Sequence, residues 1–418
     1  MIMDTHETAL PKNTDNLDVE HVAEPAVNQG ALPTTEAKPF PLGFGCMRFP
    51  SSDDEVERLI VHAVEAGVTH FDTAYVYGQS EARLGKVLAK HGLREKINIA
   101  SKVQPIMLRK PEDFEKHFST QLGRLQTDYI DYYQIHMMAS LKIWNRLVKM
   151  GVIEWAEAQK AAGRIRKFGF SYHGGSEEFT RIADAYDWDF TLIQYNYLDK
   201  TIDSTDSPLH YAHKKGMETF IMSPLKGGRL VDSLPKAAVE AFAAPDSTGT
   251  VRTPEEWALR WLWNQSEVSC VYSGMNSMDQ LEENIRIANE SSPDMLTDSD
   301  QATIAAARKG IIDVMRVSCT ACNYCLPCPE GVDIPTCLIN YNNIAIEGRM
   351  KALANYASST MLTERPSNAS RCTQCGRCEA KCPQKIEIRQ ELLRVEGAFE
   401  RFYFKPIIAL VRRLMRLN

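Results

Sequence analysis

Apolar runs typical of β-strands alternate with amphipathic segments eight times between residues 40 and 292. The runs are LGFGCMRF, THFDT, INIASK, YIDYYQIH, IRKFGFS, FTLIQYNY, METFIMS and VSCVYSG. Eight strand–helix units over about 250 residues have the size and order of a (β/α)8 barrel, the TIM barrel. A doubly wound open sheet competes with it, but that fold calls for a Gly-rich fingerprint after its first strand, and GFGCMRFP is a poor match. The sequence therefore predicts an α/β fold built on a closed barrel.

The alternation stops after residue 292, and the pattern beyond it predicts a second, smaller domain. We expect a connecting helix at 293–316, a mostly helical cysteine-rich domain at 317–392 and an amphipathic helix at 393–418. Residues 1–39 lack any periodicity and are rich in Pro, Thr, Asn and acids, so we expect a disordered tail. The barrel then occupies residues 40–292.

The net charge of −6 arises mostly in that tail, so it says little about partners. Residues 1–39 contain seven acidic and two basic side chains, and the remainder is close to neutral. Nothing in this balance points to nucleic acid. The N-terminus lacks a basic start followed by an apolar run, and no run of 18 apolar residues exists, so we expect a cytoplasmic protein.

Eight of the eleven cysteines fall into two short runs, each ending in Cys-Pro. Such clustering in a chain without a secretion signal indicates metal or redox chemistry rather than disulfides. The second run fits C-x2-C-x2-C-x3-C-P, and the first has one residue fewer before its last cysteine. The runs consist of Cys319, Cys322, Cys325 and Cys328, and of Cys372, Cys375, Cys378 and Cys382.

Structural zinc is the competing interpretation, but zinc sites usually take cysteines in pairs. Three cysteines in succession with a separate Cys-Pro fit two [4Fe–4S] clusters, in which the fourth cysteine of each run ligates the other cluster. We therefore expect one cluster on Cys319, Cys322, Cys325 and Cys382, and the other on Cys372, Cys375, Cys378 and Cys328. The remaining Cys46, Cys270 and Cys337 are interpreted as small buried hydrophobic residues. The runs resemble a dicluster ferredoxin, and the helical pattern between them is similar to the α-helical ferredoxin family.

In the barrel, four polar residues follow the second, third and fourth predicted strands. They are Asp72 and Tyr77 in FDTAYVYG, Lys102 in IASKV and His136 in YYQIHM. Each alone has an ordinary structural explanation, such as capping, packing or a buried hydrogen bond. Their joint placement at the carboxyl ends of barrel strands, where such barrels hold their active sites, favours a catalytic role.

These motifs resemble the aldo/keto reductase family, together with GRIRKFGFS, IQYNY, SPLKGG and SGMNSMDQLEEN. The resemblance covers about residues 40–290 and implies a barrel that reduces an aldehyde or ketone with a nicotinamide cofactor, NAD(P)H. Reducing a carbonyl leaves charge on oxygen, which a proton and fixed donors must meet. Tyr77 would deliver the proton, Lys102 would lower the phenol pKa, Asp72 would hold Lys102, and His136 would orient the carbonyl.

The resemblance implies cofactor contacts as well. Ser171 and Gln194 would hold the nicotinamide carboxamide. Tyr172 stands in place of the family's asparagine, and Met222 in place of an aromatic residue. The family's two basic residues for the NADPH phosphate align with Gly274 and Gln280, which leaves the choice between NAD and NADP open. The other positions that the resemblance implies are Ser223, Leu225, Ser273 and Asn284.

The two halves transfer electrons differently, because nicotinamide passes a hydride and each cluster passes one electron. Three explanations stay open: structural clusters, a flavin in this chain or a flavoprotein partner, or a flavin bound in the barrel. A different class of function is an electron-transfer subunit with a silent barrel, working with a ferredoxin or flavoprotein. The intact set of four polar residues favours the enzyme.

Two basic segments have alternative interpretations. Arg371, Arg377, Lys381 and Lys385 surround the second cysteine run. They are either ordinary surface charge or a device that raises the cluster potential and receives an acidic redox partner. Residues 407–417 alternate apolar residues with arginines, so they could lie on an anionic membrane, but we expect them to pack on their own domain or a neighbouring subunit.

Overall fold

The computed structural model describes residues 40–414, except 139, 173–175, 199–206, 320–324, 364, 383 and 402–404. The predicted tail at 1–39 and the ligand Cys322 therefore lie outside the described residues. Within the described part, no helix combines the length and the apolar character that crossing a membrane requires.

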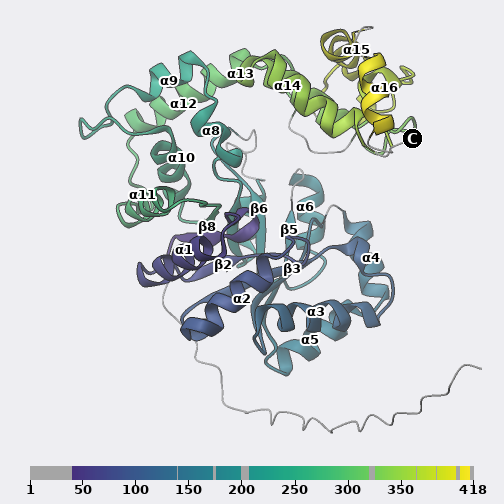
Figure 1. Cartoon of the computed structure of the whole chain (residues 1–418). Coiled ribbons are helices and arrows are strands. Elements are labelled where there is room, and N and C mark those ends of the chain that lie inside the picture. Colours follow the sequence, from purple (N-terminus) through teal and green to yellow (C-terminus); the bar gives the residue numbers. More distant parts are fainter. Residues whose placement is uncertain are drawn as a thin grey trace, which may run out of the picture. The chain divides into compact units, whose positions relative to one another are not determined.

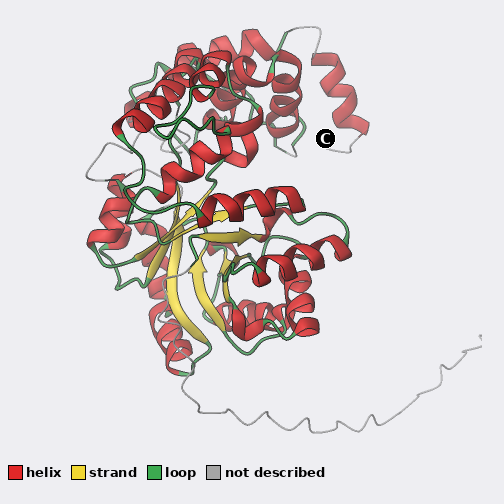
Figure 2. Cartoon of the chain, turned by 90° about the vertical axis from the view of Figure 1, so that its left-hand side faces the viewer, coloured by secondary structure: helices red, strands yellow, loops and turns green. Residues whose placement is uncertain are grey.

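Eight parallel strands close into a barrel in the order β1-β2-β3-β4-β5-β6-β7-β8, which confirms the predicted (β/α)8 fold and rules out the open sheet. Figure 1 labels β2, β3, β5, β6 and β8, and Figure 2 shows the strands enclosed by helices. Their bounds are Leu42–Gly45, His70–Asp72, Asn98–Val103, Ile130–Ile135, Ile165–Tyr172, Phe190–Gln194, Glu218–Met222 and Cys270–Ser273.

The helices of the barrel follow the strands as the alternation predicts. Ser52 caps the first of them by accepting a hydrogen bond from the Glu55 amide. Helices α1 to α11 are Asp53–Glu65, Ser80–His91, Glu112–Leu125, Leu141–Lys149, Val152–Ala161, Ser176–Ala183, Pro208–Lys214, Arg229–Asp232, Lys236–Phe242, Pro254–Trp263 and Met278–Asn289. Short 3-10 turns extend the strand ends at Cys46–Arg48 (η1) and Pro105–Met107 (η3).

Aromatic side chains fill the interior of the barrel beneath the carboxyl ends of the strands. Tyr132, Phe190, Phe220 and Tyr272 are buried there in one cluster, with ring centroids of neighbouring pairs 5.1 to 5.7 Å apart. Because side chains alternate along a strand, the next inward position is two residues further on. This packed layer is therefore the floor on which the polar residues at the strand ends lie.

Helix α12 (Asp298–Val314) lies within the segment predicted as a connecting helix, 293–316, and packs against α9. Ile304 and Ile311 are buried with Phe242 and Trp257. Helices α13 (Ile334–Glu347) and α14 (Arg349–Tyr356) confirm the helical segment expected between the cysteine runs. They meet at Gly348, whose φ of 78° lies in the left-handed region that glycine adopts without strain.

The cysteine-rich region has its own core, in which Tyr356, Leu392, Val395 and Phe399 are buried. Its last helices are α15 (Ile388–Phe399) and α16 (Lys405–Leu414). Arg412 on α16 donates 2.7 Å hydrogen bonds to two backbone carbonyls, those of Met361 and Thr363. Helix α16 therefore contacts its own domain, which is one of the two packings expected for this segment.

Candidate functional site

Asp72 and Lys102 form a buried ion pair at the carboxyl ends of β2 and β3. The Lys102 ammonium donates to both carboxylate oxygens, at 2.6 and 2.7 Å. Only 1% of the Lys102 residue is exposed. Charges are rarely buried unless they are paired, so this geometry ties the strand ends together and fixes the ammonium in place.

Tyr77 and His136 complete the group. Tyr77 lies in the loop between β2 and α2, and burial raises its pKa more than the nearby charge of the Lys102 ammonium lowers it. The ammonium lies 5.0 Å from the centre of the Tyr77 ring. The rings of Tyr77 and His136 are 5.9 Å apart, edge to face. The structure thus brings together all four polar residues that the sequence singles out.

The electrostatics of the phenol differ from expectation. Burial raises the pKa of Tyr77, and the nearby Lys102 charge lowers it by a smaller amount, so the net shift is upward. The predicted fall in the Tyr77 pKa is wrong, because desolvation of the phenolate outweighs the cation. A raised pKa keeps the phenol protonated at neutral pH, and this suits a proton donor.

The ammonium, in contrast, stays charged. Burial works to lower the pKa of Lys102, but the charge and hydrogen bond of Asp72, with Tyr77, outweigh it and the pKa is raised. Burial also raises the pKa of Asp72, and Lys102 opposes that rise. Lys102 is therefore a fixed positive charge beside the Tyr77 ring.

Gln134 belongs to this site and was missed by the sequence reasoning. Its amide donates to Asp72 at 3.4 Å, it is fully buried, and it pairs with Lys102 across β3 and β4. The signal was available, since Gln134 is two residues beyond the inward Tyr132 and two before His136. Cys46 also lies close enough to Asp72 and Lys102 to sense their charges, and burial raises its thiol pKa.

The residues predicted to hold a cofactor lie at the other half of the same mouth. Ser171 and Gln194 stand at the ends of β5 and β6, and Gln194 pairs in register with Met222 on β7. Gln194 is exposed, and its amide has no hydrogen-bond partner among the described residues. An exposed, unpartnered carboxamide at the strand ends fits the donor and acceptor needs of a nicotinamide carboxamide.

The remaining positions follow β7 and β8. Ser223 and Leu225 come after β7, and Ser273 ends β8, where it accepts a 3.0 Å hydrogen bond from Asn284 on α11. Gly274 is exposed, and Gln280 accepts from the Asn276 amide at 3.0 Å. None of these positions supplies a positive charge for a phosphate, as the sequence indicates.

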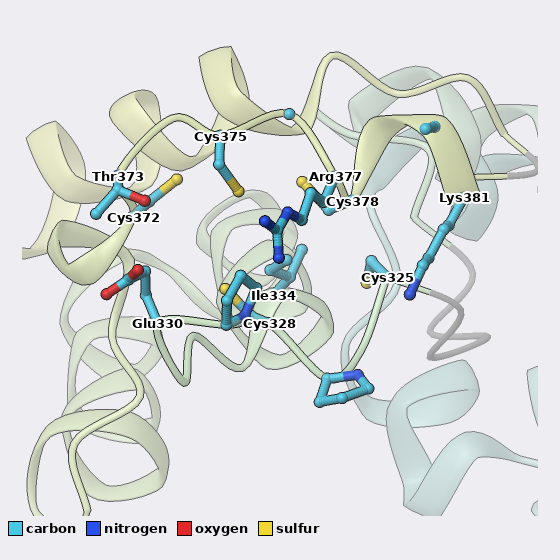
Figure 3. A pocket seen from close by; sticks show the side chains of 14 residues that line it. Cys325, Cys328, Glu330, Ile334, Cys372, Thr373, Cys375, Arg377, Cys378 and Lys381 are labelled. Atoms are coloured by element: carbon cyan, nitrogen blue, oxygen red, sulfur yellow. The ribbon is translucent and has the colours of Figure 1, made fainter.

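Five of the predicted cluster ligands border one cavity of about 570 Å³ in the cysteine-rich domain. Figure 3 shows Cys328 facing Cys375 and Cys378 across it, with Cys372 and Cys325 at its sides. The Gln374 amide donates to the Cys372 sulfur at 3.4 Å, as backbone amides do to thiolates. Several thiols around a cavity much larger than a single ion fit an iron–sulfur cluster.

Two further observations concern the thiols. The described residues, which leave out Cys322, include no group of three or more Cys, His, Asp or Glu side chains arranged to hold one metal ion. Cys46, Cys270 and Cys337 are buried, as expected.

Comparison with known proteins matches both halves of the chain. A model described as the aldo/keto reductase family matches residues 41–307, and one described as a 4Fe–4S dicluster domain matches residues 318–387. An uncharacterized oxidoreductase of Bacillus subtilis, YrpG, is 30% identical over 216 residues, 45% of this chain and 64% of that protein. The NADH-specific methylglyoxal reductase of Escherichia coli is 22% identical over 55% of this chain and 81% of its own length.

Solved structures agree on the barrel. An aldo-keto reductase from Bacillus halodurans in its holo form superposes with a TM-score of 0.53 at 25% identity, over 64% of this chain and 91% of its own. A reductase from Klebsiella pneumoniae in complex with NADPH gives 0.52 at 21% identity, over 63% and 89%. Nothing in these matches supports a flavin in the barrel.

Proposed function

The chain belongs to the aldo/keto reductase family and bears a 4Fe–4S dicluster domain, and we propose that it reduces an aldehyde or ketone with a nicotinamide cofactor. The observation that supports this most strongly is the convergence of Tyr77, Lys102, Asp72 and His136 at one mouth of the barrel. The proposal also agrees with the E. coli relative, which is named for NADH and a carbonyl compound.

The nicotinamide supplies the hydride when it is bound, and the chain supplies the rest. Tyr77 donates its phenolic proton to the oxygen of the reduced carbonyl, since its raised pKa keeps that proton in place at neutral pH. Lys102 stabilises the phenolate left behind, because its charged ammonium lies beside the Tyr77 ring, 5.0 Å from the ring centre. Asp72 and Gln134 keep the ammonium fixed, and His136 orients the carbonyl.

Ser171 and Gln194 would hold the nicotinamide carboxamide, with Met222 beside them at the end of β7. The ribose phosphates would lie toward Ser223, Leu225, Ser273 and Gly274, with Gln280 and Asn284 on α11. The first amides of this helix, which follow Ser277, carry the partial positive charge of a helix N-terminus. Because no lysine or arginine stands among these residues, we expect NADH and NADPH to be accepted with similar affinity.

Exposed apolar side chains follow each of the first four strands. Met47 after β1, Val76 beside Tyr77, Ile106 in η3 and Met137 beside His136 are 40% to 73% exposed. Large apolar side chains are rarely exposed in a group without a contact to make. We therefore propose a substrate whose carbonyl has an apolar substituent, such as an aryl or long alkyl group, rather than a small sugar.

The dicluster domain would hold two [4Fe–4S] clusters for electron transfer. Cys328 would join Cys372, Cys375 and Cys378 on one, and these four border the same cavity, together with Cys325 of the other set. The other would use Cys319, Cys322, Cys325 and Cys382. We assign residues 40–292 to the barrel, 293–316 to the connecting helix, 317–392 to the cluster domain and 393–418 to the C-terminal segment.

The test uses the full chain, purified and loaded with iron and sulfide without oxygen. Oxidation of NADH and of NADPH is followed with a panel of aryl, alkyl and sugar aldehydes and ketones. The Tyr77→Phe variant should lose carbonyl reduction by about 10² to 10⁴-fold. Tyr75→Phe is the matched control, since Tyr75 lies in the same loop but packs on His117 and Arg124.

Three results would contradict the proposal. They are a wild type that reduces no carbonyl on the panel with either nucleotide, a Tyr77→Phe variant that keeps full activity, and a Tyr75→Phe variant that loses as much activity as Tyr77→Phe. An active cluster domain beside such a silent barrel would favour the electron-transfer subunit instead.

A further inference from the structure

The second cysteine run lies at the surface of its domain. Cys375 is exposed, whereas Cys378 is buried. Arg377 stands between them, and the chain around Cys372, Cys375 and Arg377 forms one wall of the cavity (Figure 3). A cluster held here is within reach of another protein, and short distance is the first requirement for electron transfer between proteins.

Two cations border this cavity, and we refer to Arg377 and Lys381 as the cationic rim. Both are exposed, and within the described part of the chain neither is paired with a carboxylate. The contrast with Arg389 is clear, because that nearby guanidinium is paired with Glu379 at 2.9 Å. The rim charges are therefore free to meet charges from outside.

More positive charge surrounds the rim. Arg371 and Lys385, which precede and follow the rim residues in the sequence, are exposed. The Arg371 Nε donates a 3.1 Å hydrogen bond to the backbone carbonyl of Glu330. Among the described residues that line the cavity, Glu330 alone has a carboxylate side chain. Positive charge thus exceeds negative charge around the exposed thiols, although the chain as a whole has a net charge of −6.

We propose that the cluster on Cys328, Cys372, Cys375 and Cys378 accepts electrons from another protein. The cationic rim docks this partner, a small acidic one-electron carrier protein. The reduced carrier gives one electron to the oxidised cluster, so the carrier is oxidised as the cluster is reduced and no bond is made or broken. Opposite surface charges speed such an encounter and orient it. The inference rests on the cluster assignment of the proposed function and goes beyond carbonyl reduction.

The experiment compares two reductants on the full chain with its clusters assembled. Chemically reduced acidic flavodoxin is the carrier, because its flavin absorbance differs from that of the clusters. Dithionite, a small molecule that needs no docking site, is the second reductant. Stopped-flow absorbance gives the rate of cluster reduction for wild type, for the double variant Arg377→Gln/Lys381→Gln, and for Lys351→Gln. Lys351 is an exposed cation of the same domain that does not line the cavity.

In the double variant we expect the second-order rate with flavodoxin to fall about tenfold or more at low salt. The wild-type rate should drop as salt is added, and the rate of the double variant should depend on salt much less. Dithionite should reduce all three proteins at rates within about twofold of one another, and Lys351→Gln should behave as wild type with flavodoxin.

Each of three outcomes would overturn docking at the rim: an unchanged flavodoxin rate in the double variant, an equal loss in Lys351→Gln, or an equal loss with dithionite. The last would show that the cations act on the cluster itself. A chain that assembles no clusters would overturn the cluster assignment and the docking site together. A chain with both clusters and an unaltered rate would overturn the docking site alone.

Discussion

Replacing Asp72 with asparagine removes the negative charge beneath Lys102 and keeps the size of the side chain. The Lys102 ammonium then has no carboxylate partner in a position where it is 1% exposed. Breaking one partner of a buried ion pair generally costs about 3–5 kcal/mol, because the other charge is left uncompensated. We therefore expect the barrel of Asp72→Asn to lose several kcal/mol of stability at pH 7.

An upper limit follows from the titration of lysine. In the variant, Lys102 can become neutral by losing its proton, and the buried charge is then removed. At pH 7 this deprotonation costs about 4.6 kcal/mol for an ordinary lysine pKa near 10.4, so the loss of stability cannot be much larger than this. The loss should therefore lie between about 3 and 4.6 kcal/mol.

The pH dependence has a definite sign. In the wild type the Lys102 pKa is raised, so its contribution is present below the ordinary lysine pKa and is lost only as pH rises above it. In the variant the folded-state pKa of Lys102 is depressed, so the unfolded chain binds more protons and stability rises with pH. The difference between the two proteins should shrink as pH rises from 7 toward 10.

Tryptophan fluorescence provides the assay, because all six tryptophans lie between residues 144 and 263, inside the barrel. Urea midpoints at pH 7 and 9.5 measure barrel unfolding without a signal from the cluster domain. The control is Asp72→Asn with Lys102→Met, which removes both charges and should recover most of the loss. A loss below about 1 kcal/mol at pH 7, or one that does not shrink at pH 9.5, would refute the reasoning.

Three other predictions concern the site and the clusters. Burial raises the pKa of Tyr77 above the ordinary phenol value of 10.0, so Tyr77 should keep its proton up to that pH. The rate of carbonyl reduction should therefore show no fall caused by Tyr77 ionisation below pH 10.0, and a fall near pH 8 would contradict this. Ile106→Ser should raise KM about tenfold for an aryl aldehyde and leave a sugar aldehyde unaffected, whereas the exposed Val251→Ser should change neither. Cys375→Ser should lower the iron content from about eight to about four per chain, and the buried Cys337→Ala should keep it at about eight, which iron analysis decides.

Local patterns predicted much of this molecule. Eight alternations of strand and helix led to the barrel, because burying one face of every helix on a parallel sheet leaves few other arrangements. The cysteine spacing indicated the dicluster domain, because three of the four thiolates of each such cluster come from one short run. The positions of Tyr77, Lys102 and His136 followed too, since the carboxyl ends of barrel strands always share one mouth.

The tertiary structure decided what depends on burial and on contacts between distant segments. Motifs alone implied that Lys102 would lower the Tyr77 pKa, but the packed barrel desolvates the phenol, and this effect is larger. The sequence pattern places Gln134 on the inward side of its strand, but its hydrogen bond to Asp72 forms only where β2, β3 and β4 lie side by side. The basic residues of the second cysteine run had two interpretations in the sequence. Folding left Arg377 and Lys381 exposed at the cavity and paired Arg389 with Glu379, because charge pairing is set by positions in space and not by order along the chain.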